Sequence, residues 1–116
     1  MRREVPSEEC VMADSADKAA MFWGNVHSAG RDILVAICDE NLIGKDIGDK
    51  PRINVSKSFY GGRLMDGAAA LDAMKKATIG NIIGKNIVAL AEKSGFITKE
   101  NIIFIDEIPH AQFVKS

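Results

Sequence analysis

The chain has little of what marks a secreted, membrane-spanning or metal-binding protein. Its two cysteines, Cys10 and Cys38, lie in a polar leader and at the end of an apolar run, and they make no disulfide framework. No apolar run approaches the roughly 18 residues of a spanning helix, and none follows Arg2 and Arg3 as in a secretory signal. These absences predict a cytoplasmic protein that does not contact a membrane.

An excess of either charge is also missing. Lys and Arg total 15 against 16 Asp and Glu, so overall charge favours neither nucleic acid nor membrane as a partner. A length of 116 residues with 47% hydrophobic content suits one domain with one core. We expect residues 1–19, which are polar and contain Pro6, to be a flexible leader, and residues 20–116 to be the domain. The natural start is either Met1 or Met21.

The first part of the domain predicts a β-hairpin. Two β-compatible runs, Ala20–His27 and Asp32–Cys38, are separated by a short polar break that contains Gly30. The second run is apolar from Ile33 onward, which is typical of a central strand covered on both faces.

A further strand is predicted from Pro51 to Tyr60. Ile53 and Val55 point to one side, and the residues between them are polar. Continued alternation puts Phe59 on the apolar side, so we expect Phe59 rather than Tyr60 to lie in the core.

The longest predicted element is helical, from Asp66 to Gly95. At 100° per residue five large aliphatic side chains share one stripe: Ile79, Ile82, Ile83, Ile87 and Leu90. The larger apolar residues before them, Leu71 and Met74, point in a direction that differs by about 100°. We therefore predict a break near Thr78–Gly80 that divides the segment into two helices. Asp66 is the predicted N-cap, Lys93 the last helical residue, and Gly95 the C′ residue.

The C-terminal part is predicted to be extended. A strand at Asn101–Ile105 is followed by Asp106 and Glu107, and a last strand is expected at Gln112–Val114. The predicted fold class is α+β: a small single domain with a mixed or antiparallel sheet of about four to five strands packed on a two-part helix.

No catalytic group, metal site or cofactor motif is predicted. Cys38 ends an apolar run and precedes two acids, so we interpret it as a buried structural cysteine rather than a nucleophile. The histidines and cysteines lack metal-ligand spacing. Gly61 and Gly62 precede a helix but lack the P-loop pattern, and a tight turn that needs φ > 0 is favoured over an anion site.

Local charge is more informative. Between Lys50 and Met65 the chain carries no acid and four bases, Lys50, Arg52, Lys57 and Arg63, with Phe59 and Tyr60 inside the run. Cations, an aromatic ring and glycines that permit close approach are what an RNA contact surface uses. The structural alternative is a solvated strand face whose aromatic residues belong to the core.

Three polar side chains are further candidates. Asn81 shares a stripe of the predicted helix with Thr78 and Lys85, and it either contacts a ligand or bonds backbone groups at the break. His110 follows Pro109, and in an extended segment His110 and Gln112 point the same way. Such a pair either binds a base or carboxylate, or is hydrogen-bonded within the fold.

Several separated blocks resemble a known family. They are Phe59-Tyr60-Gly61-Gly62, Lys76 to Gly84, Ile108 to Val114 and the early strand Ile33 to Glu40. Together, over about residues 21–115, they resemble a small archaeal family catalogued as domain of unknown function four hundred and twenty-four. The resemblance implies an archaeal, cytoplasmic, single-domain protein and brings no established activity. It places six candidates inside signature blocks: Tyr60, Gly61, Gly62, Asn81, His110 and Gln112. At Gly80 a similar protein is expected to carry Ala, and Gly would weaken a helix by about 1 kcal/mol.

Three hypotheses follow. The first is a non-catalytic module that binds RNA or a ribonucleoprotein, attached to the translation machinery, and uses the four bases with Tyr60, Gly61, Gly62, Asn81, His110 and Gln112. The second is an enzyme or small-molecule-binding protein with a pocket at Gly61-Gly62, Asn81 and His110. The third is a structural homo-oligomer that pairs through its apolar helix, which exposure of Gly80 and Gly84 in the monomer would favour.

Overall fold

A long β-hairpin opens the part of the chain that the computed structural model describes, residues 20–50 and 52–115. Strands β1 (Phe22–Ala29) and β2 (Asp32–Asp39) pair antiparallel along their whole length. Gly30 takes a left-handed φ of 62° in the two-residue turn, a conformation that glycine adopts without strain. The predicted hairpin is confirmed. The leader predicted for residues 1–19 lies outside the described residues.

The remaining described elements are short helices and strands. They are η2 (Glu40–Leu42), β3 (Asp46–Ile47), β4 (Ile53–Asn54), α2 (Lys57–Tyr60), β5 (Arg63–Met65), α3 (Gly67–Lys76), β6 (Ile79–Ile83), α4 (Lys85–Lys93), η3 (Lys99–Asn101), β7 (Ile102–Ile105) and β8 (Ile108–Val114). None of the described helices is long and apolar enough to cross a membrane.

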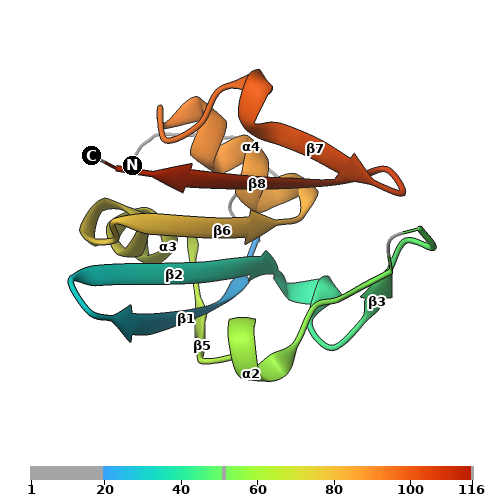
Figure 1. The fold of residues 1–116 in the computed structure, drawn as a ribbon, viewed down its shortest axis with the longest axis horizontal. Helices are drawn as coiled ribbons and strands as arrows, with labels where there is room; N and C mark the ends of the chain where they lie inside the picture. Colours follow the sequence, from blue (N-terminus) through green and yellow to red (C-terminus); the bar gives the residue numbers. More distant parts are fainter. Residues whose placement is uncertain (1–19, 51, 116) are drawn as a thin grey trace, which may run out of the picture.

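Six strands form one mixed sheet in the order β5-β1-β2-β6-β8-β7 (Figure 1). β2 and β6 are parallel, and the other neighbours are antiparallel. A separate two-stranded sheet, β3–β4, lies beyond the end of β2. The predicted α+β class with a mixed sheet is confirmed. The sheet has six strands rather than four or five, because β5 and β6 form where turn and helix were expected.

The two-part helix predicted from Asp66 to Gly95 is partly wrong, because its middle segment is a central strand of the sheet. Its first part is confirmed: α3 follows Asp66, whose Oδ1 accepts a hydrogen bond from the Ala69 N–H at 2.9 Å. The predicted break is also present. However, Ile79–Ile83 continue as strand β6, and only Lys85–Lys93 form a second helix. That helix ends at Lys93 as predicted, with Gly95 at a φ of 85°.

Pairing on both sides explains why β6 is a strand. β6 lies between β2 and β8, so every residue of this isoleucine-rich segment has two neighbours in the ladder. Gly80 lies opposite Phe113 of β8, and a Cβ on Gly80 would lie 2.0 Å from Phe113 Cε2. This glycine therefore makes room for an aromatic ring rather than weakening a helix. Both Gly80 and Gly84 are buried, so the exposure that would favour pairing of chains through that helix is absent.

The strand predicted for residues 51–60 is also corrected. Only Ile53–Asn54 are extended, and Lys57–Tyr60 form helix α2. Ser56 Oγ accepts hydrogen bonds from the N–H groups of Ser58 and Phe59, which caps the helix. The turn reverses the expected orientation of the two aromatic residues: Tyr60 is 5% exposed, whereas Phe59 is only half-buried.

The C-terminal strands form a second hairpin. β7 confirms the predicted strand, and β8 begins at Ile108, four residues before the predicted strand. Asp106 and Glu107 both have positive φ values, 55° and 73°, as in the tight turns that match the twist of a hairpin. Along β8 the alternation is as predicted: Ala111 and Phe113 are buried, whereas His110 and Gln112 are not.

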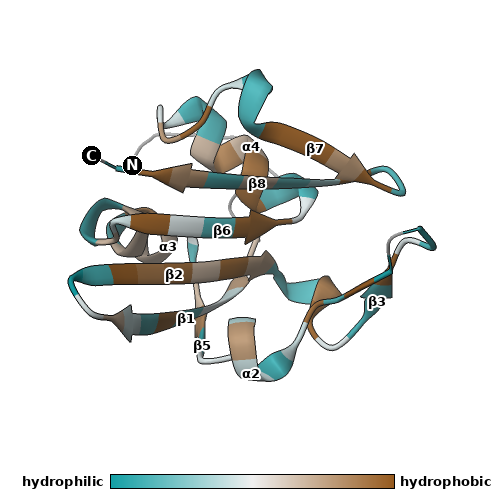
Figure 2. Cartoon of the chain, viewed as in Figure 1, coloured by the Kyte–Doolittle hydropathy of each residue, from teal (hydrophilic) through white to brown (hydrophobic). Residues whose placement is uncertain are grey.

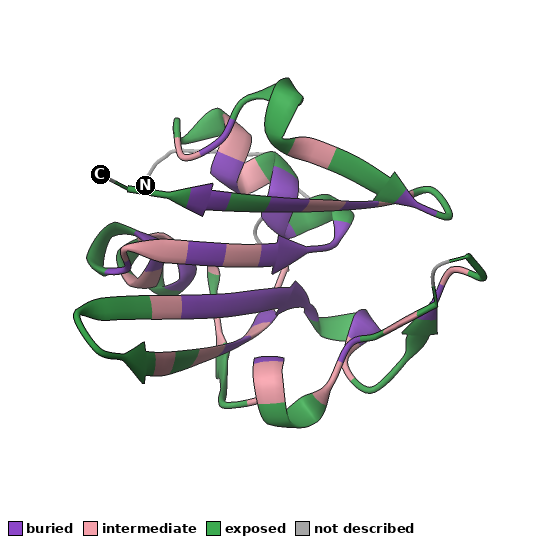
Figure 3. Ribbon diagram, in the orientation of Figure 1, coloured by how far each residue is buried: buried purple, intermediate pink, exposed green. Residues whose placement is uncertain are grey.

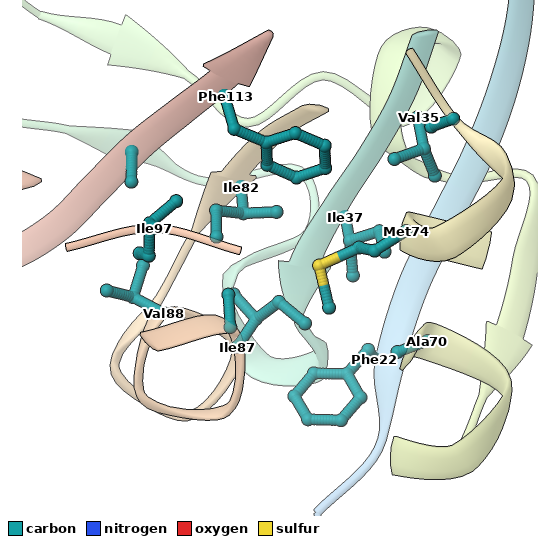
Figure 4. Packing of buried hydrophobic residues seen from close by; sticks show 13 residues of the cluster. Phe22, Val35, Ile37, Ala70, Met74, Ile82, Ile87, Val88, Ile97 and Phe113 are labelled. Carbon is teal, nitrogen blue, oxygen red and sulfur yellow. The ribbon is translucent and has the colours of Figure 1, made fainter. Parts of the chain in front are cut away.

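The two faces of the sheet are covered unequally. Helices α3 and α4 lie behind the sheet in Figure 1 and bury the main core against it; Figure 4 shows Ile37, Ile82 and Phe113 of that core. We call this side the helical face. On the other side, α2 and the segment from η2 to β4 pack on β1 and β2. Central β2 is accordingly apolar along most of its length and buried toward its end (Figures 2 and 3). No described helix crosses β6 and β8 on this second side, which we call the open face.

Candidate functional site

Three predicted site residues from three different elements meet on the open face. Tyr60 of α2 donates its hydroxyl hydrogen to Asn81 Oδ1 of β6 at 2.8 Å. His110 of β8 approaches the same oxygen with Nε2 at 3.0 Å. The structure thus brings together residues that are 21 and 29 positions apart in the chain. We call this arrangement the Tyr60–Asn81–His110 network.

Burial sets the protonation of this network. Desolvation raises the pKa of the Tyr60 hydroxyl above its ordinary value of 10, so the hydroxyl remains a donor. Desolvation lowers the pKa of His110 below its ordinary 6.5, so the ring is neutral near pH 7. Because Asn81 Oδ1 can only accept, His110 Nε2 carries the ring hydrogen and Nδ1 holds a lone pair. Among the described residues, neither Nδ1 nor the Asn81 amide nitrogen has a hydrogen-bond partner.

Gln112 lies beside the network on the same face of the sheet. It lies directly opposite Asn81 in the β6–β8 ladder, and it is exposed. The next row of the same face is apolar, because Leu34, Ile79 and Val114 are successive partners in β2, β6 and β8. Val114 is 75% exposed. The open face therefore presents a row of polar groups beside an apolar strip.

Contacts with β1 hold α2 in the position that lets Tyr60 reach Asn81. His27 Nε2 donates to the Phe59 carbonyl oxygen at 2.9 Å, and the two rings stack with centroids 5.0 Å apart. Asn25 Nδ2 donates to the Ser58 carbonyl oxygen at 3.3 Å. Neither His27 nor Asn25 was predicted from the sequence to have this role. Their spacing of two residues in a strand was the available signal, since it places them on one face.

Gly61 and Gly62 are needed for close approach rather than for positive φ. Gly61 has a φ of −90°, and a Cβ there would lie 2.7 Å from the Lys57 carbonyl oxygen. A Cβ on Gly62 would lie 2.6 Å from Asn25 Oδ1. Both glycines lie in the turn between α2 and β5, at the β1 side of the sheet, whereas His110 lies on β8, three strands from β1. Tyr60, rather than the glycines, makes the connection to Asn81.

The four predicted cations divide between two sides of the molecule. Lys50 and Arg52 lie in the loop between β3 and β4, and Lys57 begins α2; all three are exposed. Arg63 lies in β5 opposite Gly24 and lines a groove with residues of α3, so it belongs to the helical side. The basic run of the sequence is therefore not one continuous surface.

Other reactive groups are withdrawn into the fold. Cys38 is fully buried, and desolvation raises the pKa of its thiol to about 12, so it is not a thiolate near neutral pH. Within residues 20–50 and 52–115, no group of three or more His, Cys, Asp or Glu side chains is placed to hold a metal ion.

The fold has a solved counterpart, and the sequence has a family. A crystal structure of an uncharacterized conserved protein from Methanopyrus kandleri matches with a TM-score of 0.71 and 23% identity, over 84% of this chain and 95% of that chain. At this identity the likeness shows the fold alone. No curated protein matches the sequence significantly. The model of the family described as a protein of unknown function (DUF424) matches residues 26–115, which include the Tyr60–Asn81–His110 network and Gln112, and the chain belongs to that family.

Proposed function

We propose that this protein is a non-catalytic RNA-binding module that holds unpaired nucleotides on its open face. The Tyr60–Asn81–His110 network carries this proposal, because it fixes donor and acceptor groups over β6 and β8, which no described helix crosses on the open face. Sequence-specific RNA recognition targets unpaired bases, whose edges carry neighbouring donors and acceptors.

The available groups suit a base edge. The Asn81 amide nitrogen is a donor, and Nδ1 of the neutral His110 ring is an acceptor, both held by bonds to Asn81 Oδ1 and both without another partner among the described residues. Gln112, one strand away, adds an amide that can donate and accept. Because the buried Tyr60 hydroxyl fixes Asn81 in advance, binding would order few side chains.

The apolar strip beside these groups suits the flat face of a base. Val114 is 75% exposed, and Leu34 and Ile79 are half-buried next to it. A base that bonds to Asn81 or Gln112 would cover part of this strip and remove apolar area from water.

Cations at the α2 side suit the phosphates. Lys57 lies on the helix that supplies Tyr60, and Arg52 lies just before it in the chain. The overall charge of −1 makes such contacts local, so affinity should depend on salt and on these particular side chains. Arg63 lies on the helical side and is expected to contribute nothing, which makes it a matched control.

A non-catalytic role is favoured because the candidate nucleophiles are held protonated. Burial keeps the Cys38 thiol and the Tyr60 hydroxyl un-ionised at neutral pH, and the Tyr60 hydrogen is already donated to Asn81.

Fluorescence anisotropy of short, labelled single-stranded RNA with the full chain tests the proposal. We expect binding at low salt that weakens as salt rises. Lys57→Glu should weaken binding by about tenfold or more for all sequences, whereas Arg63→Glu should leave it unchanged. Gln112→Ala should alter the preference among the four homopolymers. Absence of binding at low salt, or equal losses in Lys57→Glu and Arg63→Glu, would remove this function.

A further inference from the structure

Strand β7 forms one outer edge of the sheet, and its side chains are unusually apolar for that position. Its four residues, Ile102–Ile105, carry no charge and no proline. Phe104 is 69% exposed and Ile103 is 58% exposed. β7 is strongly hydrophobic in Figure 2 and mostly exposed in Figure 3. In the described part of the chain, only β8 pairs with it, so its outer backbone groups are open for pairing.

We propose that β7 is the interface of a symmetric homodimer, in which it pairs antiparallel with β7 of a second copy about a twofold axis at Ile103. Such an interface is isologous, because the same strand serves both copies. It joins two six-stranded sheets into one continuous sheet. This assembly goes beyond RNA binding and does not depend on it.

The side chains of β7 fit a pairing centred on Ile103. Ile103 lies opposite His110 in the β7–β8 ladder and so belongs to the open face, where it would meet the second copy's Ile103. Ile102 and Phe104 project to the helical face, where both line a groove beside Val88 of α4. In the dimer each Phe104 would lie opposite the other copy's Ile102. The two exposed apolar side chains of β7, Ile103 and Phe104, would thereby be covered.

Charge does not decide for or against this pairing. Lys99 and Glu100 lie in η3 before the strand, and Asp106 and Glu107 lie in the turn after it. Lys99 of each copy would lie level with Glu107 of the other, which is favourable, and Glu100 level with Asp106, which is not. A pairing centred on Phe104 would instead place Ile102 opposite Asp106. The register at Ile103 is therefore the better one.

Other features favour β7 over the opposite edge. β5 is three residues long and carries Arg63, and Asp66 follows it directly. Charges of this kind are what guard an edge strand against pairing. Leu64 of β5 is 45% exposed, which makes it a matched control for Ile103.

Sedimentation equilibrium of the full chain, from about 1 μM to about 1 mM, tests the dimer. We expect a species with twice the 12.6 kDa of one chain. Ile103→Lys places two ammonium groups at the twofold axis and should raise the dissociation constant by about tenfold or more, whereas Leu64→Lys should not. A wild-type protein that stays monomeric, or an Ile103→Lys protein that dimerises as well as wild type, would overturn the proposal.

Cysteine cross-linking tests the register with substitutions that disturb folding less. In a Cys10→Ser background, the Ile103→Cys protein should oxidise to a disulfide-linked dimer. A residue at the twofold axis lies opposite the same residue of the second copy, at a distance that a disulfide can span. Phe104→Cys and Leu64→Cys should cross-link more slowly. Equal rates at Leu64 would exclude β7 as the interface, and a faster rate at Phe104 would exclude this register. Neither measurement involves RNA, so the dimer can be refuted or supported independently of the proposed RNA binding.

Discussion

Replacing Gly80 by alanine should destabilise the protein, although the same change in a helix would stabilise it. A Cβ at this position would lie 2.0, 2.3 and 2.6 Å from three carbons of the Phe113 ring. Ordinary contact begins near 3.4 Å, so the ring would have to move by about 1.4 Å. Phe113 is only 7% exposed, and its ring centroid lies 5.6 Å from that of Phe96. The ring has little space into which it can retreat.

The size of the expected loss of stability follows from this crowding. Adding a methyl group to a filled core typically costs about 1–3 kcal/mol, and complete loss of a buried phenylalanine costs about 3–5 kcal/mol. We expect Gly80→Ala to lower the free energy of unfolding by about 2–3 kcal/mol. In an exposed helix the same substitution would raise that free energy by about 1 kcal/mol. The sign alone therefore distinguishes strand from helix at this position.

Urea denaturation followed by the fluorescence of Trp23, the chain's single tryptophan, measures this change. A double-mutant cycle adds the control: in a Phe113→Leu background, which removes the ring, the cost of Gly80→Ala should fall by about 1 kcal/mol or more. If Gly80→Ala changes the stability by less than about 0.5 kcal/mol, or costs the same in both backgrounds, the contact with Phe113 is not the reason for glycine here.

Two further predictions concern buried polar groups. Asp39 accepts hydrogen bonds from the N–H groups of Asn86 and Ile87, at 2.9 and 2.8 Å, at the start of α4, so Asp39→Ala should lower the free energy of unfolding by about 1–3 kcal/mol in urea denaturation. Burial outweighs these bonds and raises the pKa of the Asp39 carboxyl above 3.8, so the folded state favours the protonated form. Relative to the Asp39→Asn variant, the free energy of unfolding of the wild type should therefore be greatest below pH 3.8. It should decline as the pH rises through the pKa of the folded state. Identical pH profiles would contradict this. Tyr60→Phe removes the donor to Asn81 and should cost about 0.5–1.5 kcal/mol, and unchanged stability together with unchanged RNA affinity would show that the network is not a rigid unit.

The parts of the fold that depend on local pattern could be predicted from the sequence. The hairpin around Gly30, the Asp66 cap of α3 and the alternation of His110 and Gln112 in β8 each depend on neighbouring residues. The end of α4 near Gly95 is of the same kind. In each case the chemistry of the turn or cap and the apolar period point to one conformation.

The parts that depend on distant partners could not be predicted. The isoleucines of β6 match a helical stripe, and only pairing with β2 and β8 decides for a strand. At α2, alternation from Ile53 suggested a strand, but Ser56 caps a single helical turn that swings Tyr60 inward. Asn81 was a candidate for its place in a helix, yet it takes part in the network because β6 is a strand. The residue types of Tyr60, Asn81 and His110 indicated a polar site, but the distances between these side chains depend on the register of the sheet.

The parallel pairing of β2 with β6 has a consequence for how the molecule assembles. β1–β2 and β7–β8 are hairpins whose strands are close in sequence, so each can form early and alone. β6 is the strand that joins them, and its contact with β2 closes a loop of about forty residues. We therefore expect the docking of β6 to be slower than the formation of either hairpin, and the Tyr60–Asn81–His110 network cannot form before it, because Asn81 belongs to β6.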